Sequence, residues 1–224
     1  MRFSIIVPML NEAPGMSGVL ARLVELERQG CEILIVDGGS DDGSVALAER
    51  AGFRVLASTK GRARQMNLGA AKATGDVLLF LHADTLLPEG ALANVRQTML
   101  KTDAVWGRFD VVIDGAHPML RVIARLMNRR SRWTGIATGD QAIFVSRAAF
   151  DAVGGYPDQP LMEDIELSKR LKRIGPPACL RARVATSGRR WESRGVWRTV
   201  LLMWRLRWAY WRGTPAEQLA QRYR

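Results

Sequence analysis

Three acidic residues, Glu12, Asp37 and Asp84, each follow a short apolar run that is typical of a buried strand. In an open α/β sheet, ligands bind in the crevice beyond the carboxyl ends of the strands. Carboxylates at such an edge can accept hydrogen bonds from a nucleobase and can hold a divalent cation. We therefore expect these acids to lie along one edge of a sheet and to form a ligand site.

The elements that must position these acids alternate along the first half of the chain. Apolar, β-branched runs predict strands, and the amphipathic segments between them predict helices. This alternation is typical of βαβ units and of a mostly parallel open sheet with helices on both faces. The sequence therefore predicts an α/β fold, with strands at 3–8, 33–36, 54–56 and 77–81 and helices at 15–29, 43–51 and 61–73.

The regular alternation fades after residue 103, where shorter apolar runs still predict mixed strands and helices. No repeat or linker marks a second domain, so we expect one domain over 1–224. We divide it into three segments, residues 1–112, 113–194 and 195–224. The further elements are expected as strands at 104–113, 141–145, 178–184 and 185–191, and as helices at 117–130, 161–174 and 195–212.

Charge is divided unevenly between the two halves of the chain. The protein has 33 Lys+Arg against 22 Asp+Glu, for a net charge of +11. Residues 1–112 hold 12 basic and 13 acidic side chains (net −1), whereas residues 113–224 hold 21 and 9 (net +12). The apolar share of 47% is that of a globular protein. We therefore expect the second half to face an anionic acceptor, an anionic membrane surface, or both.

Several common kinds of site are absent from the sequence. The loop 37–44 lacks the glycine patterns of a dinucleotide site, a P-loop and a nucleophile elbow. Cys31 and Cys179 stand apart with no zinc-type spacing, as expected of thiols in a reducing compartment. No apolar stretch reaches the ~18 residues of a membrane span, and the first run meets Asn11 with no cleavage site. We expect a cytoplasmic protein, with attachment to the inner face of the cell membrane left open.

Short motifs follow one another in a fixed order along most of the chain. Together they resemble the family 2 glycosyltransferases with the GT-A fold, which implies an inverting transferase that uses a nucleotide sugar. The tail from Thr186 to Arg224 resembles a bacterial subgroup labelled arsenosugar-biosynthesis-type glycosyltransferases. The motifs are Ser4–Glu12, Ile35–Ser44, Gly61–Gly69, Leu81–Asp84, Gly139–Gln141 and Met162–Leu167.

The resemblance assigns residues 1–112 to the nucleotide-sugar donor. It places the nucleobase at Asp37, although the loop of Asp37 also reads as a turn with a helix cap. It places Arg62 beside the diphosphate, the alternative being a solvated first turn of a helix. The implied donor-binding residues are Pro8, Asn11, Glu12, Asp37, Gly61, Arg62, Gln65, Asn67 and Ala83.

The resemblance also implies a divalent cation, Mn²⁺ or Mg²⁺, held by Asp84. Asp84 occupies the last position of the family's Asp-x-Asp motif, where the cation neutralises the diphosphate leaving group. His82 replaces the first Asp of that motif. An imidazole ligand would suit Mn²⁺ better than Mg²⁺, and the alternative for His82 is a local hydrogen bond at a strand end.

For the transfer step, the resemblance makes Asp164 the general base that removes the proton of the acceptor hydroxyl. The alternative is that Asp164 and its acidic neighbours merely complement a helix dipole. Residues 113–194 then hold the acceptor and the base. The implied acceptor-side residues are Gly139, Asp140, Glu163, Arg189, Arg190 and Trp191.

Two features of the tail bear on the acceptor. The sequence Arg189-Arg190-Trp191 matches only the end of the Gln-x-x-Arg-Trp motif of processive synthases, which favours single addition. Residues 195–224 are expected to be helical and amphipathic, and either to lie in a membrane interface or to pack on the sheet. Tryptophan and arginine recur there at intervals of seven, at Trp197, Trp204 and Trp211 and at Arg198, Arg205 and Arg212.

Two other functions remain open on the sequence. A nucleotidyltransferase could use metal-bound acids on a similar sheet, but the sequence has no glycine-rich, lysine-containing phosphate loop. A nucleic-acid-binding protein would fit the basic charge, but would leave the acids at the strand ends unexplained. The expected partners are therefore a nucleotide-sugar donor and a hydroxyl acceptor, with no nucleic acid, and an anionic membrane surface is left open.

Overall fold

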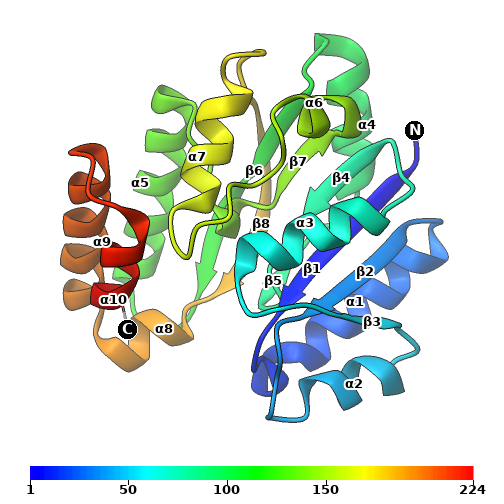
Figure 1. Ribbon diagram of the computed structural model, residues 1–224, viewed down its shortest axis with the longest axis horizontal. Coiled ribbons are helices and arrows are strands. Elements are labelled where there is room, and N and C mark those ends of the chain that lie inside the picture. The colour runs from blue at the N-terminus through cyan, green and yellow to red at the C-terminus, as the bar shows by residue number, and fades with distance from the viewer. Residues whose placement is uncertain (224) are drawn as a thin grey trace.

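The apolar runs of the first half form four adjacent parallel strands, which make up one half of a single sheet (Figure 1). The computed structural model describes residues 1–223. Its eight-stranded sheet has the order β3-β2-β1-β4-β7-β6-β8-β5. The strands are β1 (Phe3–Met9), β2 (Glu32–Asp37), β3 (Val55–Ala57), β4 (Val77–Phe80), β5 (Thr85–Leu86), β6 (Trp106–Asp114), β7 (Ile143–Ser146) and β8 (Ala178–Ser187).

Strands β3, β2, β1 and β4 run parallel, with Ile6 of β1 opposite Leu34 of β2 and Phe80 of β4. Every residue of β1 is buried, because helices cover both faces of the sheet. Beyond β4 the sheet changes direction: β7 pairs antiparallel with both β4 and β6, and β6 pairs parallel with β8. The predicted α/β class with a mostly parallel open sheet is confirmed, and its carboxyl-end edge lies where the sequence placed the acids.

Two sets of helices cover the sheet. Helices α1 (Met16–Arg28), α2 (Ser44–Arg50) and α4 (Ala91–Thr102) share one buried cluster with the side chains of Ile5 and Val7. The helices on the other face pack around Ile6, Leu78 and Phe80. They are α3 (Arg62–Lys72), α6 (Arg147–Ala152) and α7 (Glu163–Leu171).

A third group of helices stands at the left of Figure 1, beside β6 and α7. Helix α9 packs through Val196 on α5 and through Leu206 on Ile165 of α7 and Leu219 of α10. The group thus packs on β6 and on the start of α7. Its members are α5 (Met119–Thr134), α8 (Arg189–Arg194), α9 (Val196–Trp211) and α10 (Ala216–Tyr223), and two short 3-10 turns, η1 (Ala13–Gly15) and η2 (Gly139–Gln141), lie in loops.

The predicted second strand at 185–191 is wrong. Strand β8 continues to Ser187, because Ala185 and Thr186 still pair with β6 and β5. The N–H of Gly188 then donates to the carbonyl of Asp114 at 2.6 Å, and the chain turns into α8. The sequence patterns did not predict β5, α4 and α6. Helix α7 begins two residues later than predicted, because Met162 is left-handed at φ 64°.

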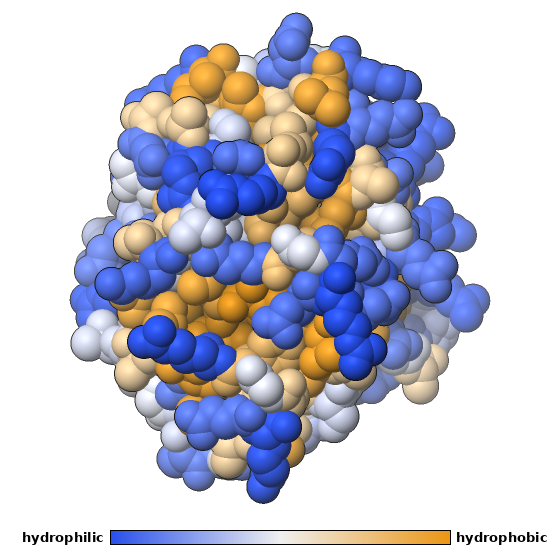
Figure 2. All heavy atoms as spheres, turned by 90° about the vertical axis from the view of Figure 1, so that its right-hand side faces the viewer, coloured by the Kyte–Doolittle hydropathy of each residue, from blue (hydrophilic) through white to orange (hydrophobic). Residues whose placement is uncertain are grey.

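The distribution of hydrophilic and apolar side chains differs between the face on the right of Figure 1 and the face formed by α9. Figure 2 shows the former: hydrophilic side chains project over most of it, and apolar atoms are visible mainly in the hollows between them. Five large exposed apolar side chains instead gather on α9, on the opposite side. Within residues 1–223, no helix is both long enough and apolar enough to cross a bilayer.

Candidate active site

A cleft of about 530 Å³ opens at the carboxyl-end edge of the sheet. Its walls come from the loops after β1 and β4, the end of β8, η2, and the start of α7, with α8 and α9 closing one side. The cleft brings together most of the predicted site residues, from distant segments of the chain. These are Pro8, Asn11, Glu12, Arg62, His82, Ala83, Asp84, Gly139, Asp140, Glu163, Asp164, Arg189, Arg190 and Trp191.

Asp164 lies in the first turn of α7, and its carboxylate is held on both sides. Its Oδ2 accepts a hydrogen bond from the N–H of Gly139 at 2.8 Å, and its Oδ1 accepts from the N–H of Ile165 at 2.7 Å. The left-handed Met162 sets the chain direction just before this turn. The carboxylate is therefore oriented by backbone groups and lines the cleft, which is the placement that a general base requires.

Glu163 is buried beside Arg62 of α3. Its side chain is 6% exposed, and its Oε1 lies 3.6 Å from Nη1 of Arg62. Burial raises the pKa of the Glu163 carboxyl; the charge of Arg62 opposes the rise and that of Asp164 adds to it. Burial would lower the pKa of Arg62, but the carboxylates of Glu163, Asp140 and Asp164 raise it. Arg62 therefore remains a cation among these acids.

His82 makes a local contact with η2. Its Nδ1 lies 3.2 Å from Oδ1 of Asp140, whereas its Nε2 is buried with no hydrogen-bond partner among residues 1–223. A Cβ atom added to Gly139 would stand 2.3 Å from that Nε2, so only glycine fits there. Burial tends to raise the pKa of Asp140, but the hydrogen bond and charge of His82 lower it. The structure thus shows a local contact between His82 and Asp140, and the role of His82 as a metal ligand stays a prediction.

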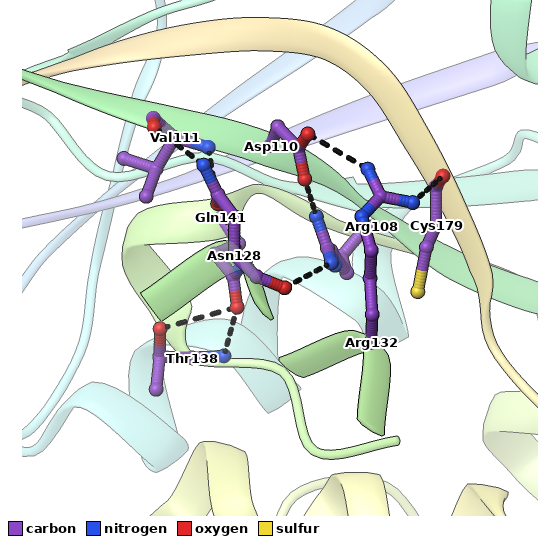
Figure 3. Close-up of polar contacts among 8 residues, drawn as sticks. All are labelled: Arg108, Asp110, Val111, Asn128, Arg132, Thr138, Gln141 and Cys179. Atoms are coloured by element: carbon purple, nitrogen blue, oxygen red, sulfur yellow. Dashed lines mark hydrogen bonds and ion pairs between the residues drawn. The ribbon is translucent and has the colours of Figure 1, made fainter. Parts of the chain in front are cut away.

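A buried polar network anchors η2 to β6 and α5 (Figure 3). Oε1 of Gln141 accepts from the N–H of Thr138 at 3.2 Å, and its Nε2 donates to Oδ1 of Asn128 at 3.4 Å. The amide of Asn128 in turn bonds to both the N–H and the carbonyl of Val111, at 2.9 Å each. This network fixes the loop that presents Gly139 to Asp164.

The same network extends to a buried arginine. Arg108 is fully buried, donates to the carbonyl of Asn128 at 3.1 Å and pairs with Asp110. Asp110 also accepts from Arg132 at 2.7 Å, and Arg132 donates to the carbonyl of Cys179 at 3.0 Å. Figure 3 shows Asp110 between the two guanidinium groups. Because Arg108 is fully buried, the loss of Asp110 as its partner would leave an unpaired buried charge, which is costly.

The first loop and the tail meet at Glu12. Its Oε2 lies 3.1 Å from Nη2 of Arg189, at the start of α8. Burial and the nearby charge of Asp84 raise the pKa of Glu12, and Arg189 opposes the rise. The loop 37–44 supports this arrangement, because hydroxyl groups of Ser40 and Ser44 accept from the N–H groups of Asn11 and Glu12 at 2.9 Å.

Asp84 fits a cation that is shared with a diphosphate. Its Oδ1 accepts from Thr85 at 3.2 Å, and the residue lines the cleft. In the portion of the chain that the structure describes, no three His, Cys, Asp or Glu side chains form a metal-binding group. Mg²⁺ is commonly held by one or two carboxylates together with substrate phosphates. The residues present therefore suit a cation that takes most of its oxygen ligands from the donor.

Four predicted donor-binding residues do not line the cleft: Asp37, Gly61, Gln65 and Asn67. Asp37 is buried, and its carboxylate accepts from the N–H groups of Gly39 and Ser40 at 2.8 and 3.0 Å. Gln65 donates to the carbonyls of Met9 and Val36, and Asn67 exchanges hydrogen bonds with Tyr156. Gly61 precedes α3 as its N-cap. In this structure the side chains of Asp37, Gln65 and Asn67 bond to backbone groups of neighbouring segments.

Several cleft residues were not identified from the sequence. They come mostly from α9 and the segments around it, where only the fold shows which side faces inward. On α9 itself, Thr199, Met203 and Arg207 are spaced four residues apart, which places them on one face of a helix. That spacing is the sequence pattern from which these three residues could have been predicted. The others are Thr138, Leu161, Met162, Ile165, Thr186, Ser187, Ser193, Arg194 and Tyr223.

Two arginines place positive charge near Asp164: Arg207 lines the cleft, and Arg130 lies outside the set of lining residues. Among residues 1–223, Arg207 and Arg130 have no carboxylate within 4.0 Å, and Nε and Nη2 of Arg130 are buried without a partner. Burial lowers the pKa of Arg130 to about 10, and the charge of Arg207 acts in the same direction. Burial also lowers the pKa of Arg207, opposed by Asp164. An anion here would relieve unpaired positive charge.

Comparison with known proteins agrees with this architecture. Residues 4–154 match the model of the family described as Glycosyl transferase family 2. The chain is 27% identical over 199 residues to the probable glycosyltransferase YdaM of Bacillus subtilis (strain 168), covering 78% of this chain and 47% of that one. It is 33% identical over 178 residues to the PGL/p-HBAD biosynthesis glycosyltransferase Rv2957 of Mycobacterium tuberculosis (strain ATCC 25618 / H37Rv), covering 69% and 62%.

The fold has counterparts among solved structures. The mannosyltransferase PcManGT from Pyrobaculum calidifontis superposes with a TM-score of 0.68 at 22% identity, over 93% of this chain and 61% of that chain. The fold is thus the GT-A fold that the resemblance implied. The chain belongs to glycosyl transferase family 2. It spans about half to three fifths of the length of the curated relatives named above.

Proposed function

We propose that this protein is an inverting glycosyltransferase that moves one sugar from a nucleoside-diphosphate donor to an acceptor hydroxyl. The observation that supports it most is the carboxylate of Asp164, fixed by the N–H of Gly139 in the cleft that Asp84 also lines. Residues 1–112 supply much of the donor side through Glu12, Arg62 and Asp84. Residues 113–194 supply the base and the acceptor side.

In the proposed reaction, the acceptor oxygen attacks the anomeric carbon of the sugar from the side opposite the diphosphate. The bond from that carbon to the phosphate oxygen breaks, and its electron pair leaves with the nucleoside diphosphate. The proton of the acceptor hydroxyl passes to Asp164. The backbone hydrogen bonds of Asp164 hold its carboxylate in one orientation during this transfer.

Negative charge that develops on the leaving diphosphate must be offset within the cleft. Arg62 and Arg190 line the cleft. Burial is the main cause that lowers the pKa of Arg190, and the charges of Arg62 and Arg194 lower it further. Asp84 would hold a divalent cation, which supplies further charge neutralisation at the phosphate oxygens. PcManGT was solved in complex with GDP-Man and Mn²⁺, which supports a nucleotide-sugar donor and a cation in this chain.

The acceptor end of the cleft suits an anionic molecule near a membrane. Arg207 and Arg130 supply unpaired positive charge close to Asp164. The name of the mycobacterial relative places that protein in PGL/p-HBAD biosynthesis. We propose that the acceptor is a hydroxyl compound that receives a single sugar and that is lipid-linked or held at the inner face of the cell membrane. The free thiols of Cys31 and Cys179 fit a reducing compartment. The arsenosugar-type resemblance of the tail stays a prediction.

The test begins with a panel of UDP- and GDP-sugars, measured by thermal shift with and without Mn²⁺. The donor found is then used with Asp164→Asn, which keeps the shape of the side chain but cannot take the proton. We expect donor binding to survive and transfer to fall by about 10²- to 10⁴-fold. Asp158→Asn is the matched control, because Asp158 pairs with Arg64 outside the cleft. Normal turnover by Asp164→Asn would refute the mechanism.

A further inference from the structure

The outward face of α9 carries a stripe of large apolar side chains. Their exposure to water is unfavourable. Its five large side chains are spaced four, three, four and three residues apart, so they form one continuous row on the helix. Each is well over half exposed. A soluble surface rarely gathers so much apolar area in one place, and such a patch marks an interaction site. The stripe consists of Trp197 (62% exposed), Leu201 (59%), Trp204 (66%), Trp208 (61%) and Trp211 (78%).

Positive charge flanks the stripe along its whole length. Residues 195–216 contain four arginines and no Asp or Glu. Arg198, Arg205 and Arg212 each follow a tryptophan of the stripe and are exposed. The guanidinium of Arg212 lies over the ring of Trp208, 5.0 Å from its centroid. The partner that fits must therefore be negative at its surface and apolar beneath it.

We propose that the α9 stripe docks on an anionic lipid bilayer, with the helix lying in the plane of the interface. In that position tryptophan and leucine enter the boundary of the acyl chains, while arginine reaches the headgroup phosphates. A second copy of the chain fits the stripe poorly. A two-fold contact would place the arginine-flanked stripe against itself and bring like charges together.

The opposite side of α9 belongs to the cleft. Thr199, Met203 and Arg207 line the cleft, and Leu206 packs against α7 and α10. The helix that touches the bilayer is therefore also a wall of the site. This second step rests on the proposed function: docking would hold the acceptor end of the cleft at the membrane surface, where a lipid-linked hydroxyl arrives.

The test uses the full chain with vesicles of phosphatidylcholine, alone or mixed with phosphatidylglycerol, and measures the bound fraction by flotation. We expect binding to the mixed vesicles and little to phosphatidylcholine. The double variant Arg198→Gln/Arg205→Gln should lower the partition coefficient about thirtyfold, because each arginine near an anionic leaflet adds roughly fivefold. Trp204→Ser/Trp208→Ser should lower it about tenfold or more.

Leu100→Ser is the matched control. Leu100 is 69% exposed on α4, away from α9, so its replacement should leave vesicle binding unchanged. A second readout is quenching of tryptophan fluorescence by brominated lipid, since four of the seven tryptophans stand on the stripe. Equal binding to both vesicle types, or no effect of the stripe variants, would overturn the proposal. So would a concentration-dependent dimer that Trp204→Ser/Trp208→Ser abolishes.

The membrane proposal and the proposed function can fail separately. Vesicle binding is measured without any donor, and donor binding by thermal shift is measured without lipid. Wild-type donor binding with no vesicle binding would reject the docking surface alone. Vesicle binding without binding of any sugar nucleotide would reject the function alone.

Discussion

Replacing Gly139 by alanine tests the tightest contact of the site. The added Cβ would stand 2.3 Å from Nε2 and 2.5 Å from Cε1 of His82, whereas ordinary contact begins near 3.4 Å. The imidazole or η2 must therefore move by about 1 Å. His82 is buried and bound to Asp140, so that movement breaks their hydrogen bond or displaces the N–H that Gly139 donates to Asp164.

We expect Gly139→Ala to lower the free energy of unfolding by about 2 kcal/mol, within the usual range for overpacking. We expect kcat to fall by about 10²-fold, because a base displaced by about 1 Å loses its alignment. Urea unfolding gives the first quantity, and steady-state kinetics with the identified donor give the second. Gly18→Ala in α1 is the control: its Cβ meets no atom within 4 Å, so stability should rise by up to about 1 kcal/mol.

The cause is isolated by a double-mutant cycle with His82→Ala. Removing the imidazole makes room for the new methyl group, so Gly139→Ala should cost less than about 0.5 kcal/mol in the His82→Ala background. If the two losses of stability simply added, the contact between the imidazole and residue 139 would not be what requires glycine. An unchanged kcat in Gly139→Ala would likewise refute the role of this loop.

Two further predictions concern groups around the base. Gln141→Leu removes both hydrogen bonds that tie η2 to Asn128 and Thr138. We expect urea unfolding to show a loss of about 1–3 kcal/mol in stability. Kinetics should show a lower kcat, and thermal shift should show an unchanged donor affinity. The pKa of Glu12 is raised in the folded protein, so the folded state binds the proton of Glu12 more tightly than the unfolded state does. The contribution of Glu12 to stability therefore falls as the pH rises from 4.5, the ordinary pKa of this group, through the raised pKa. The melting temperature of wild type relative to Glu12→Gln should therefore increase as pH is lowered through that window, and a difference that does not change with pH would contradict this assignment.

Much of the fold followed from local patterns. The runs at 3–8 and 77–81 are apolar on both faces, which only a strand covered on both sides explains, and they form β1 and β4. The break at Gly188 was not predictable, because the residues after it keep an apolar and polar mixture that suits a strand. It depends on the hydrogen bond to the carbonyl of Asp114, a partner far away in sequence.

The site was predictable where a residue type and a strand end coincide. Asp84 follows β4, so its place in the cleft follows from topology. Gln65 was expected beside the donor, but it points into the protein and bonds to the ends of β1 and β2. Arg207 was missed for a related reason: which side of α9 faces the cleft depends on how that helix packs on α7 and α10. Such choices are made by tertiary contacts that one sequence does not display.

The central claim is that this cleft transfers a sugar with inversion, with Asp164 as the base. The most direct measurement is the anomeric configuration of the product, read by NMR from the one-bond coupling between C1 and H1, with an α-linked donor. A β-linked product, formed by wild type and lost in Asp164→Asn, is the result we predict. An α-linked product would contradict the mechanism. It would require net retention of configuration, whereas one attack from the side opposite the diphosphate inverts the anomeric carbon.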